Sequence, residues 1–344
     1  MNPVDPFWSG ALAFGRRDDL LRLVAMGCEP PHVPYGPLAE ATGDLDRARR
    51  WLAAPPLRTR GRLLTCLDPA WPARLDLLDD APAALLVEGD PACLSAPVAV
   101  AIVGTRRCTA YGRSVARTLA RALGRAGVVV VSGLARGVDA WAHHGAVEAG
   151  RTVAVLGHGL GHTSPASNRR LRDEIVERGG AVVSTWPDDF EATKWSFPRR
   201  NRWIAALSDH VVVVEAPERS GALITATEAW SMHVEGPSPV WAVPGPVGAP
   251  ASAGCLRLLS EGARVVRSVE AFVREVTGRG AEAAVPDELW LTRLCAGASL
   301  DEVAKLRGVS TLELVRELTR LEVRGVVVRL PGRRYARGGS PSHA

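Results

Sequence analysis

Residues 97–137 decide the fold of this chain, and they read PVAVAIVGTRRCTAYGRSVARTLARALGRAGVVVVSGLARG. An apolar run over 98–103 ends at a glycine, and a segment with helical periodicity follows it. A second apolar run over 128–131 ends at Ser132-Gly133. This order predicts a strand, a helix and a second parallel strand, which form one βαβ unit. The loops after the two strands meet at one sheet edge, where open α/β sheets bind ligands.

Both loops of this unit contain the residue types of a phosphate-binding site. Each loop combines glycine, a hydroxyl group and arginine: Gly104, Thr105 and Arg106 in the first, and Ser132, Gly133 and Arg136 in the second. Glycine admits a ligand to the backbone, N–H groups at a helix start attract anions, and a guanidinium pairs with phosphate. The pattern is neither GxGxxG nor a P-loop. Because glycine is also an ordinary turn residue, the unit alone leaves phosphate binding and simple turn formation both open.

Strands and helices continue to alternate after this unit. We expect strands over 98–103, 128–132, 152–156, 181–185, 210–215, 239–243 and 264–266, with helices over 113–126, 139–149, 168–178, 199–207, 222–233 and 255–261. The strands are near-continuous Val, Ala and Ile runs, which a parallel sheet covered on both faces requires. The fold class is therefore α/β, with a doubly wound, mostly parallel sheet. An extended lead-in over 63–97 precedes it, and we expect Ala84–Val87 there to form an edge strand.

The two ends of the chain differ from this central part. Residues 1–62 read as a small helical region, with helices near 8–14, 18–26 and 45–52 separated by prolines. Residues 277–286 form a small, polar linker. In 287–337, helices and a two-stranded hairpin follow one another as in a winged helix, with a capping box from Ser299 to Glu302. Its many arginines fit DNA contact, although winged helices also dock proteins. We expect the tail, 338–344, to be disordered.

Composition narrows the class of protein. The net charge of +5 suits an anionic partner, although an arginine-rich composition also drifts basic without any function. The six cysteines form no CxxC pair, which argues against a zinc site or a disulfide framework and fits a reducing cytoplasm. No apolar run approaches the length of a membrane span, and no motif calls for a cofactor.

The segment 194–202, KWSFPRRNR, is the most informative one outside the first unit. It places cations and aromatic rings at a helix start, where charge attracts phosphates and ring faces stack bases. Its candidate residues are Lys194, Phe197, Arg200, Asn201 and Arg202, and Ser220 and Gly221 follow the fifth strand at the same edge. The alternative is that Trp195 and Phe197 belong to the core and that the arginines form a solvated helix face.

Catalytic motifs are missing from the sequence. GxSxG, HExxH and paired carboxylates in one loop are all absent. The crevice carboxylates available for acid–base chemistry are Asp139, Glu215 and Glu228, and Asp139 as easily caps a helix. His143 either lines the crevice or bonds to structural groups, and we favour the structural role.

Six motifs in register resemble the DNA-processing protein A family (DprA, also called Smf). They are Gly104-Thr105-Arg106 with Tyr111-Gly112, Ser132 to Asp139 with Ala142-His143, Ala154 to Gly157, Phe197 to Arg202, Ser220 to Thr225, and Ala242 to Gly245. The resemblance implies an extended Rossmann-like DNA-binding domain over 63–276, between a SAM-like N-terminal region and a C-terminal winged helix. One departure lies at the fourth strand, where the usual Ser-Glu is replaced by Ser184-Thr185-Trp186.

The resemblance also implies a function. Members of this family bind single-stranded DNA in the cytoplasm, protect incoming strands in natural transformation, help to load the RecA recombinase and form homodimers, with no established catalysis. Carried over to this chain, the DNA-contacting residues are Arg106, Lys194, Phe197, Arg200, Asn201 and Arg202, while Ser132, Gly133, Ser220 and Gly221 furnish backbone contacts. The alternative is a nucleoside-monophosphate phosphoribohydrolase-like enzyme on the same fold, because Thr225 and Glu228 keep the TxxE spacing of its motif.

Overall fold

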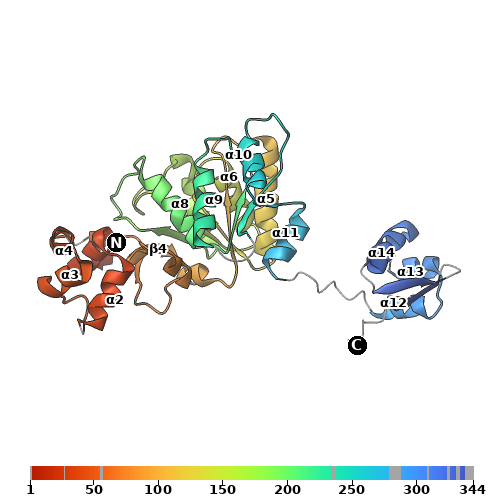
Figure 1. The fold of residues 1–344 in the computed structure, drawn as a ribbon, viewed down its shortest axis with the longest axis horizontal. Helices are drawn as coiled ribbons and strands as arrows, with labels where there is room; N and C mark the ends of the chain where they lie inside the picture. Colours follow the sequence, from red (N-terminus) through yellow and green to blue (C-terminus); the bar gives the residue numbers. More distant parts are fainter. Residues whose placement is uncertain are drawn as a thin grey trace. The chain divides into compact units, whose positions relative to one another are not determined.

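The computed structural model describes residues 2–26, 28–54, 57–233, 238–278, 288–307, 310–323, 326–330 and 334–337. The chain divides into two compact units, Met1–Gly278 and Arg279–Ala344, which are described separately (Figure 1). The predicted linker from residue 279 onward and the predicted tail over 338–344 lie outside the described residues. In the described part of the chain, no helix has the length and apolar character needed to cross a membrane.

A nine-stranded sheet forms the centre of the first unit. Its order is β11-β10-β9-β5-β6-β7-β8-β4-β3. The strands are β3 (Arg62–Thr65), β4 (Ala84–Gly89), β5 (Ala99–Val103), β6 (Val129–Ser132), β7 (Thr152–Val155), β8 (Ala181–Ser184), β9 (His210–Val213), β10 (Val240–Ala242) and β11 (Arg264–Val265). From β11 to β8 all neighbours are parallel, and β4 and β3 add two antiparallel pairings. The predicted doubly wound, mostly parallel sheet is therefore confirmed.

Helices cover both faces of this sheet because successive strand residues point to opposite sides. Val100 and Ile102 pack toward one face, which is covered by α5 (Ala110–Arg125), α6 (Val138–Val147), α7 (Arg169–Glu177) and α11 (Val269–Val276). Ala101 and Val103 pack toward the other face, which is covered by α8 (Ser196–Ala206), α9 (Ala222–Met232) and α10 (Ala253–Ser260). Figure 1 shows α8 and α9 side by side on their face.

The prediction that Ala84–Val87 forms an edge strand is wrong. These residues belong to β4, which lies between β8 and β3, so that β3 is the edge strand. All four are buried, as an inner strand requires. The strand ends at Gly89, whose φ is +99° and whose added Cβ would lie 2.2 Å from the Gly180 oxygen, so glycine is needed for this close approach to β8.

The first unit also contains the predicted small helical region. It comprises β1 (Asn2–Val4), α1 (Pro6–Phe14), α2 (Arg17–Ala25), α3 (Tyr35–Thr42), α4 (Leu45–Leu52) and β2 (Leu57–Thr59), and the 3₁₀ helices η1 (Ala73–Leu77) and η2 (Pro91–Ser95) follow. Trp51 is fully buried at its centre, and its indole N–H donates to the Phe7 oxygen at 2.9 Å. The helix α3 lies in a proline-rich stretch that the sequence predicts only as a separator between helices.

The second unit has the elements that the winged-helix prediction requires. They are α12 (Glu288–Cys295), α13 (Leu300–Arg307), α14 (Thr311–Val323) and the antiparallel strands β12 (Val327–Leu330) and β13 (Arg334–Arg337). The predicted capping box is confirmed, since the Ser299 N–H donates to Glu302 at 2.8 Å and the Glu302 N–H donates to the Ser299 hydroxyl at 3.2 Å. The role of this unit stays a prediction.

Candidate nucleic-acid interface

A cleft of about 700 Å³ lies at the carboxyl ends of β5 and β9. Four chain segments line it: the loop after β5, the loop before α6, the loop leading into α8, and the loop before α9. A second cavity of about 340 Å³ adjoins it and shares five of its residues, Arg106, Arg107, Ala135, Phe197 and Arg200. The convergence of distant loops that the sequence predicts is therefore present.

Phe197 lies where the two cavities meet. It is half-buried, and the guanidinium carbons of Arg106 and Arg200 lie 5.0 and 6.0 Å from its ring centroid. Both distances fall within the range of cation–π attraction. The ring is thus held by two cations while part of its surface faces the cleft.

Arg200 is a buried cation with incomplete pairing. Its side chain is 4% exposed, one terminal N–H donates to the Val155 oxygen at 3.0 Å, and its Nε has no hydrogen-bond partner among the described residues. A Cβ on Gly133 would lie 1.5 Å from the guanidinium, so only glycine leaves room for it. Burial lowers the pKa of Arg200, and the nearby Asp139 carboxylate opposes that shift. A buried guanidinium without a full set of partners lowers the stability of the fold, and a bound anion would supply the missing partner.

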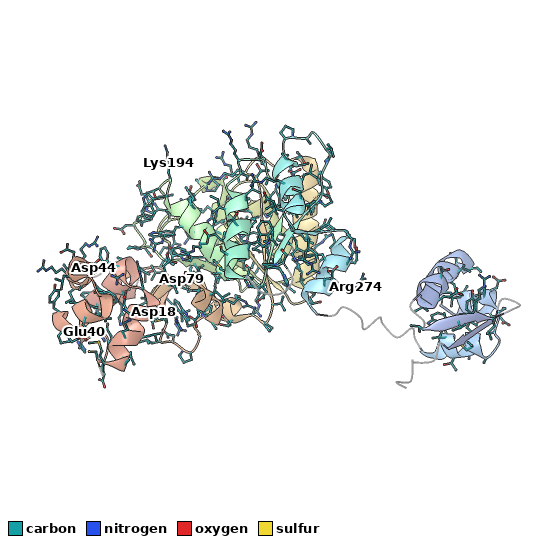
Figure 2. All side chains as sticks on the ribbon, in the orientation of Figure 1. Asp18, Glu40, Asp44, Asp79, Lys194 and Arg274 are labelled. Atoms are coloured by element: carbon teal, nitrogen blue, oxygen red, sulfur yellow. The ribbon has the colours of Figure 1, made fainter. Side chains whose placement is uncertain are left out.

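Five further cations around the two cavities are exposed: Arg106, Arg107, Arg136, Lys194 and Arg219. None of them forms an ion pair within the described residues, whereas arginines elsewhere on the unit, such as Arg74 and Arg172, pair with carboxylates. Figure 2 shows Lys194 extending from its loop into solvent. This edge of the sheet therefore carries a cluster of exposed cations that have no ion-pair partner among the described residues.

The structure brings together eleven of the thirteen residues predicted for the site. Gly104, Thr105, Arg106, Lys194, Phe197, Arg200, Asn201, Ser220 and Gly221 line the cleft, and Gly133 and Arg136 line the adjoining cavity. Asn201 also fastens two of the loops, because its amide donates to the Gly221 oxygen at 3.0 Å.

Two predicted residues, Ser132 and Arg202, line neither cavity. The Ser132 side chain is fully buried, and its hydroxyl donates to the Ile102 oxygen at 2.7 Å. Arg202 points elsewhere and forms ion pairs with Asp80 at 2.7 Å and Glu228 at 3.0 Å. Sequence reasoning missed Arg219, although an arginine in a loop after a parallel strand is the signal that located Arg106.

The candidate catalytic carboxylates are engaged in structural contacts. Glu215 accepts a hydrogen bond at 2.8 Å from the N–H of Thr109, the residue that caps α5, and Glu228 pairs with Arg202. Asp139 does not cap α6, because Gly137 is the capping residue and Asp139 lies in the first turn. Burial raises the pKa of Asp139, and it is the one carboxylate among the described residues that line the cleft.

His143 has the structural role that we favoured. Its Nδ1 lies 2.8 Å from the Thr152 hydroxyl, and its Nε2 accepts a hydrogen bond from the Leu134 N–H at 3.3 Å. The side chain is fully buried, and this burial lowers its pKa to about 3. The imidazole is therefore neutral at ordinary pH and links α6 to the sheet.

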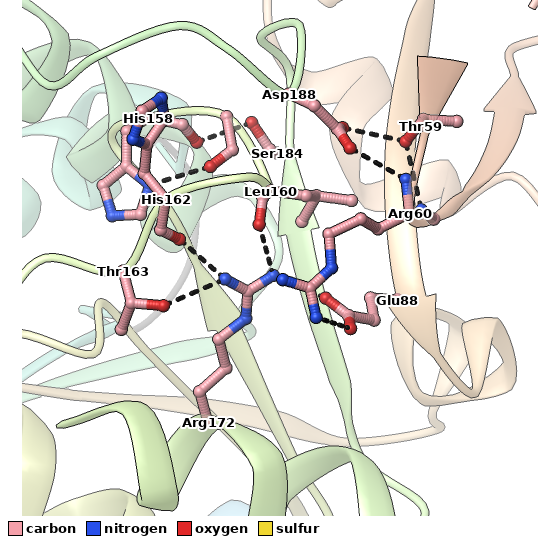
Figure 3. Close-up of polar contacts among 12 residues, drawn as sticks. Thr59, Arg60, Glu88, His158, Leu160, His162, Thr163, Arg172, Ser184 and Asp188 are labelled. Carbon is pink, nitrogen blue, oxygen red and sulfur yellow. Dashed lines mark hydrogen bonds and ion pairs between the residues drawn. The ribbon is translucent and has the colours of Figure 1, made fainter. Parts of the chain in front are cut away.

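A polar network fixes the loop that leads to Lys194 (Figure 3). The Asp188 carboxylate accepts hydrogen bonds at 2.8 Å from the Thr59 hydroxyl and at 2.8 Å from the Arg60 N–H. Beside it, the buried Arg172 donates to the Leu160 oxygen at 2.7 Å and pairs with Glu88. The end of the N-terminal region thus holds one wall of the cleft.

Comparisons with known proteins place this geometry in a family. A family model described as DNA recombination-mediator protein A matches residues 62–277. Protein Smf from Escherichia coli K12 is 32% identical, and the match covers 92% of this chain and 90% of that protein.

Two solved structures are similar over much of the chain. DNA processing protein A from Streptococcus pneumoniae gives a TM-score of 0.67 at 30% identity and covers 79% of this chain and 98% of that chain. The same protein from Helicobacter pylori, reported for its mode of binding single-stranded DNA, gives 0.58 at 32% identity and covers 65% and 99%. The chain therefore belongs to the DNA recombination-mediator protein A family, whose members are named DprA or Smf.

Proposed function

We propose that this protein binds single-stranded DNA along the cleft and acts there without catalysing a reaction. The observation that carries the proposal is the set of five exposed cations around the two cavities that have no ion-pair partner within the described residues. Proteins neutralise the nucleic-acid backbone with such cations, and the released counterions drive binding.

The aromatic ring in the cleft favours a single strand over a duplex. Bases in a duplex are stacked on one another, whereas the bases of a single strand are free to stack on a side chain such as Phe197. The buried guanidinium of Arg200 lies beside this ring and offers donors to a phosphate. The Arg200 guanidinium and the Phe197 ring are therefore close enough for one nucleotide to place its phosphate on the first and its base on the second.

The wider role in the proposal rests on family membership. We infer a cytoplasmic homodimer that protects incoming single strands in natural transformation or recombination and helps to load RecA onto them. The second unit then supplies a further contact, either to duplex DNA or to a partner protein. The single strand bound by the relative from Helicobacter pylori supports the first step of this role.

A competition experiment tests the proposal. Fluorescence polarisation of a labelled single-stranded oligonucleotide measures binding, and unlabelled single strand or duplex of the same sequence competes. We expect the single strand to compete much better than the duplex. Arg106→Ala should weaken binding, whereas Arg202→Ala should leave it nearly unchanged because its ion pairs lie outside the cleft. Equal competition by duplex, or an unaltered Arg106→Ala affinity, would overturn the proposal.

A further inference from the structure

One large aromatic side chain beside the cleft is exposed without a structural reason. Trp195 is 55% exposed, although a tryptophan side chain usually gains by burial. Its two neighbours in the chain have clear positions, since Lys194 lines the cleft and Ser196 is fully buried. Trp195 therefore stands at the rim, next to a cleft residue.

The exposure of Trp195 is held in place by its surroundings. The Ser196 hydroxyl donates to the Gly157 oxygen at 2.6 Å, and the Thr193 N–H donates to the Ser196 hydroxyl at 3.0 Å. In return, the Ser196 N–H donates to the Thr193 hydroxyl at 3.1 Å. These bonds fix the backbone on both sides of the indole, so its place at the rim does not depend on a free loop.

A cluster of aromatic rings supports the indole from beneath. Trp186 and Phe190 stack on one another at 5.5 Å, and Trp203 lies 4.8 Å from Trp186. Trp195 meets Trp186 at 6.5 Å and Phe190 at 5.7 Å, and both interplanar angles are 64°. Neither ring stacks face to face on Trp195. The cluster therefore contacts the indole edge to face and supports its position without a parallel ring lying on it.

We propose that Trp195 is a stacking platform for a base of the single strand that leaves the cleft past Lys194. The inference rests on the proposed DNA binding. A rigid aromatic ring offers contact area at little entropic cost, and every base has a face that stacks on it. Nearby charges are mixed, because Asp189 and Glu191 are exposed on the same loop. The indole therefore acts through stacking, and the neighbouring Lys194 supplies the attraction for phosphate.

The test compares strands with and without bases. Binding of an oligothymidylate of about twelve nucleotides, within the site sizes of single-strand binders, is measured beside an abasic strand of the same length. Trp195→Ala should weaken oligothymidylate binding between about fivefold and 150-fold, the range for one stacked base. It should leave abasic binding and the salt dependence unchanged, and Trp195→Phe should restore most of the loss. Lys194→Ala should instead reduce the salt slope by about 0.7.

The outcomes separate this inference from the proposed function. Tyr35→Ala, which removes an exposed aromatic ring of the N-terminal region, is the matched control and should have no effect. Unchanged oligothymidylate binding by Trp195→Ala, or an equal loss on both strands, would overturn the platform while the proposed function stands. A wild-type protein that binds neither strand would overturn both.

Discussion

Replacing Arg106 with alanine tests the charge argument most directly. Arg106 is exposed, lies between the two cavities and forms no ion pair within the described residues. Its contact with the Phe197 ring contributes about 0.5–1 kcal/mol at an exposed site, so the free energy of unfolding should change by less than about 1 kcal/mol. The change therefore removes a charge without disturbing the fold.

The size of the effect follows from counting charges. We assume that each of the five exposed cations around the cavities neutralises one phosphate. A plot of the logarithm of the binding constant against the logarithm of the salt concentration then has a slope of about −3.5. A fourfold rise in salt then weakens wild-type binding about 130-fold. Arg106→Ala should have a slope of about −2.8 and lose only about 50-fold over the same range. At low salt it should bind at least about tenfold more weakly, because a hydrogen bond to a charged group contributes about 1.5–3 kcal/mol.

The assay is a polarisation titration with a labelled single strand at several salt concentrations. Arg274→Ala is the matched control, since Arg274 is also exposed, forms no ion pair among the described residues and lies on α11, outside both cavities (Figure 2). Equal slopes for wild type and Arg106→Ala would refute the reasoning. So would an equal loss in Arg274→Ala, because net charge alone would then explain the result.

Three further changes have expected outcomes. Gly133→Ala should lower both the melting temperature and the affinity for single strands, since the new methyl group displaces the buried guanidinium; Gly36→Ala, whose Cβ meets nothing within 4 Å and which lines neither cavity, should lower neither in the same two assays. His143 stays neutral when folded, whereas the unfolded chain binds a proton below about pH 6.5, so stability falls as pH drops through that value. Chemical denaturation should show wild type losing about 1.4 kcal/mol more than His143→Gln between pH 7.5 and 5.5. Asp188→Ala leaves two hydrogen-bond donors unpaired and should destabilise the protein by about 1–3 kcal/mol in the same denaturation assay.

The central sheet was predictable because its strands are short apolar runs that need no distant information. The edges were not predictable in the same way. Arg62–Thr65 is only four residues long and mostly polar at its ends, and it becomes a strand because β4 pairs with it. The helix α3 begins after Pro34 and carries Pro37 in its first turn, where proline is tolerated. Because proline occurs both before a helix and in its first turn, the prolines alone do not show whether this stretch separates helices or begins one.

The site was predictable to the extent that loop position decides it. The connections that follow parallel strands begin at the same sheet edge, which is why Arg106, Phe197 and Ser220 converge although they come from three different connections. Side-chain direction was not predictable. Arg202 lies two residues after Arg200 in the same helix, yet α8 turns its side chain toward Asp80 and Glu228. Whether an arginine faces a cleft or a carboxylate depends on packing partners that are distant in sequence.

The pairing of Arg202 with Glu228 also bears on the enzymatic alternative. A phosphoribohydrolase needs a carboxylate beside the ribose, and the TxxE spacing of Thr225 and Glu228 was the reason to consider one. Thr225 does line the cleft, but Glu228 does not, and Glu228 is paired instead with Arg202 of α8. Asp139 lines the cleft, but it is only 6% exposed and interacts electrostatically with the nearby Arg200 guanidinium. Among the described residues that line the two cavities, five exposed cations have no ion-pair partner and Asp139 is the one carboxylate, an arrangement suited to holding a polyanion.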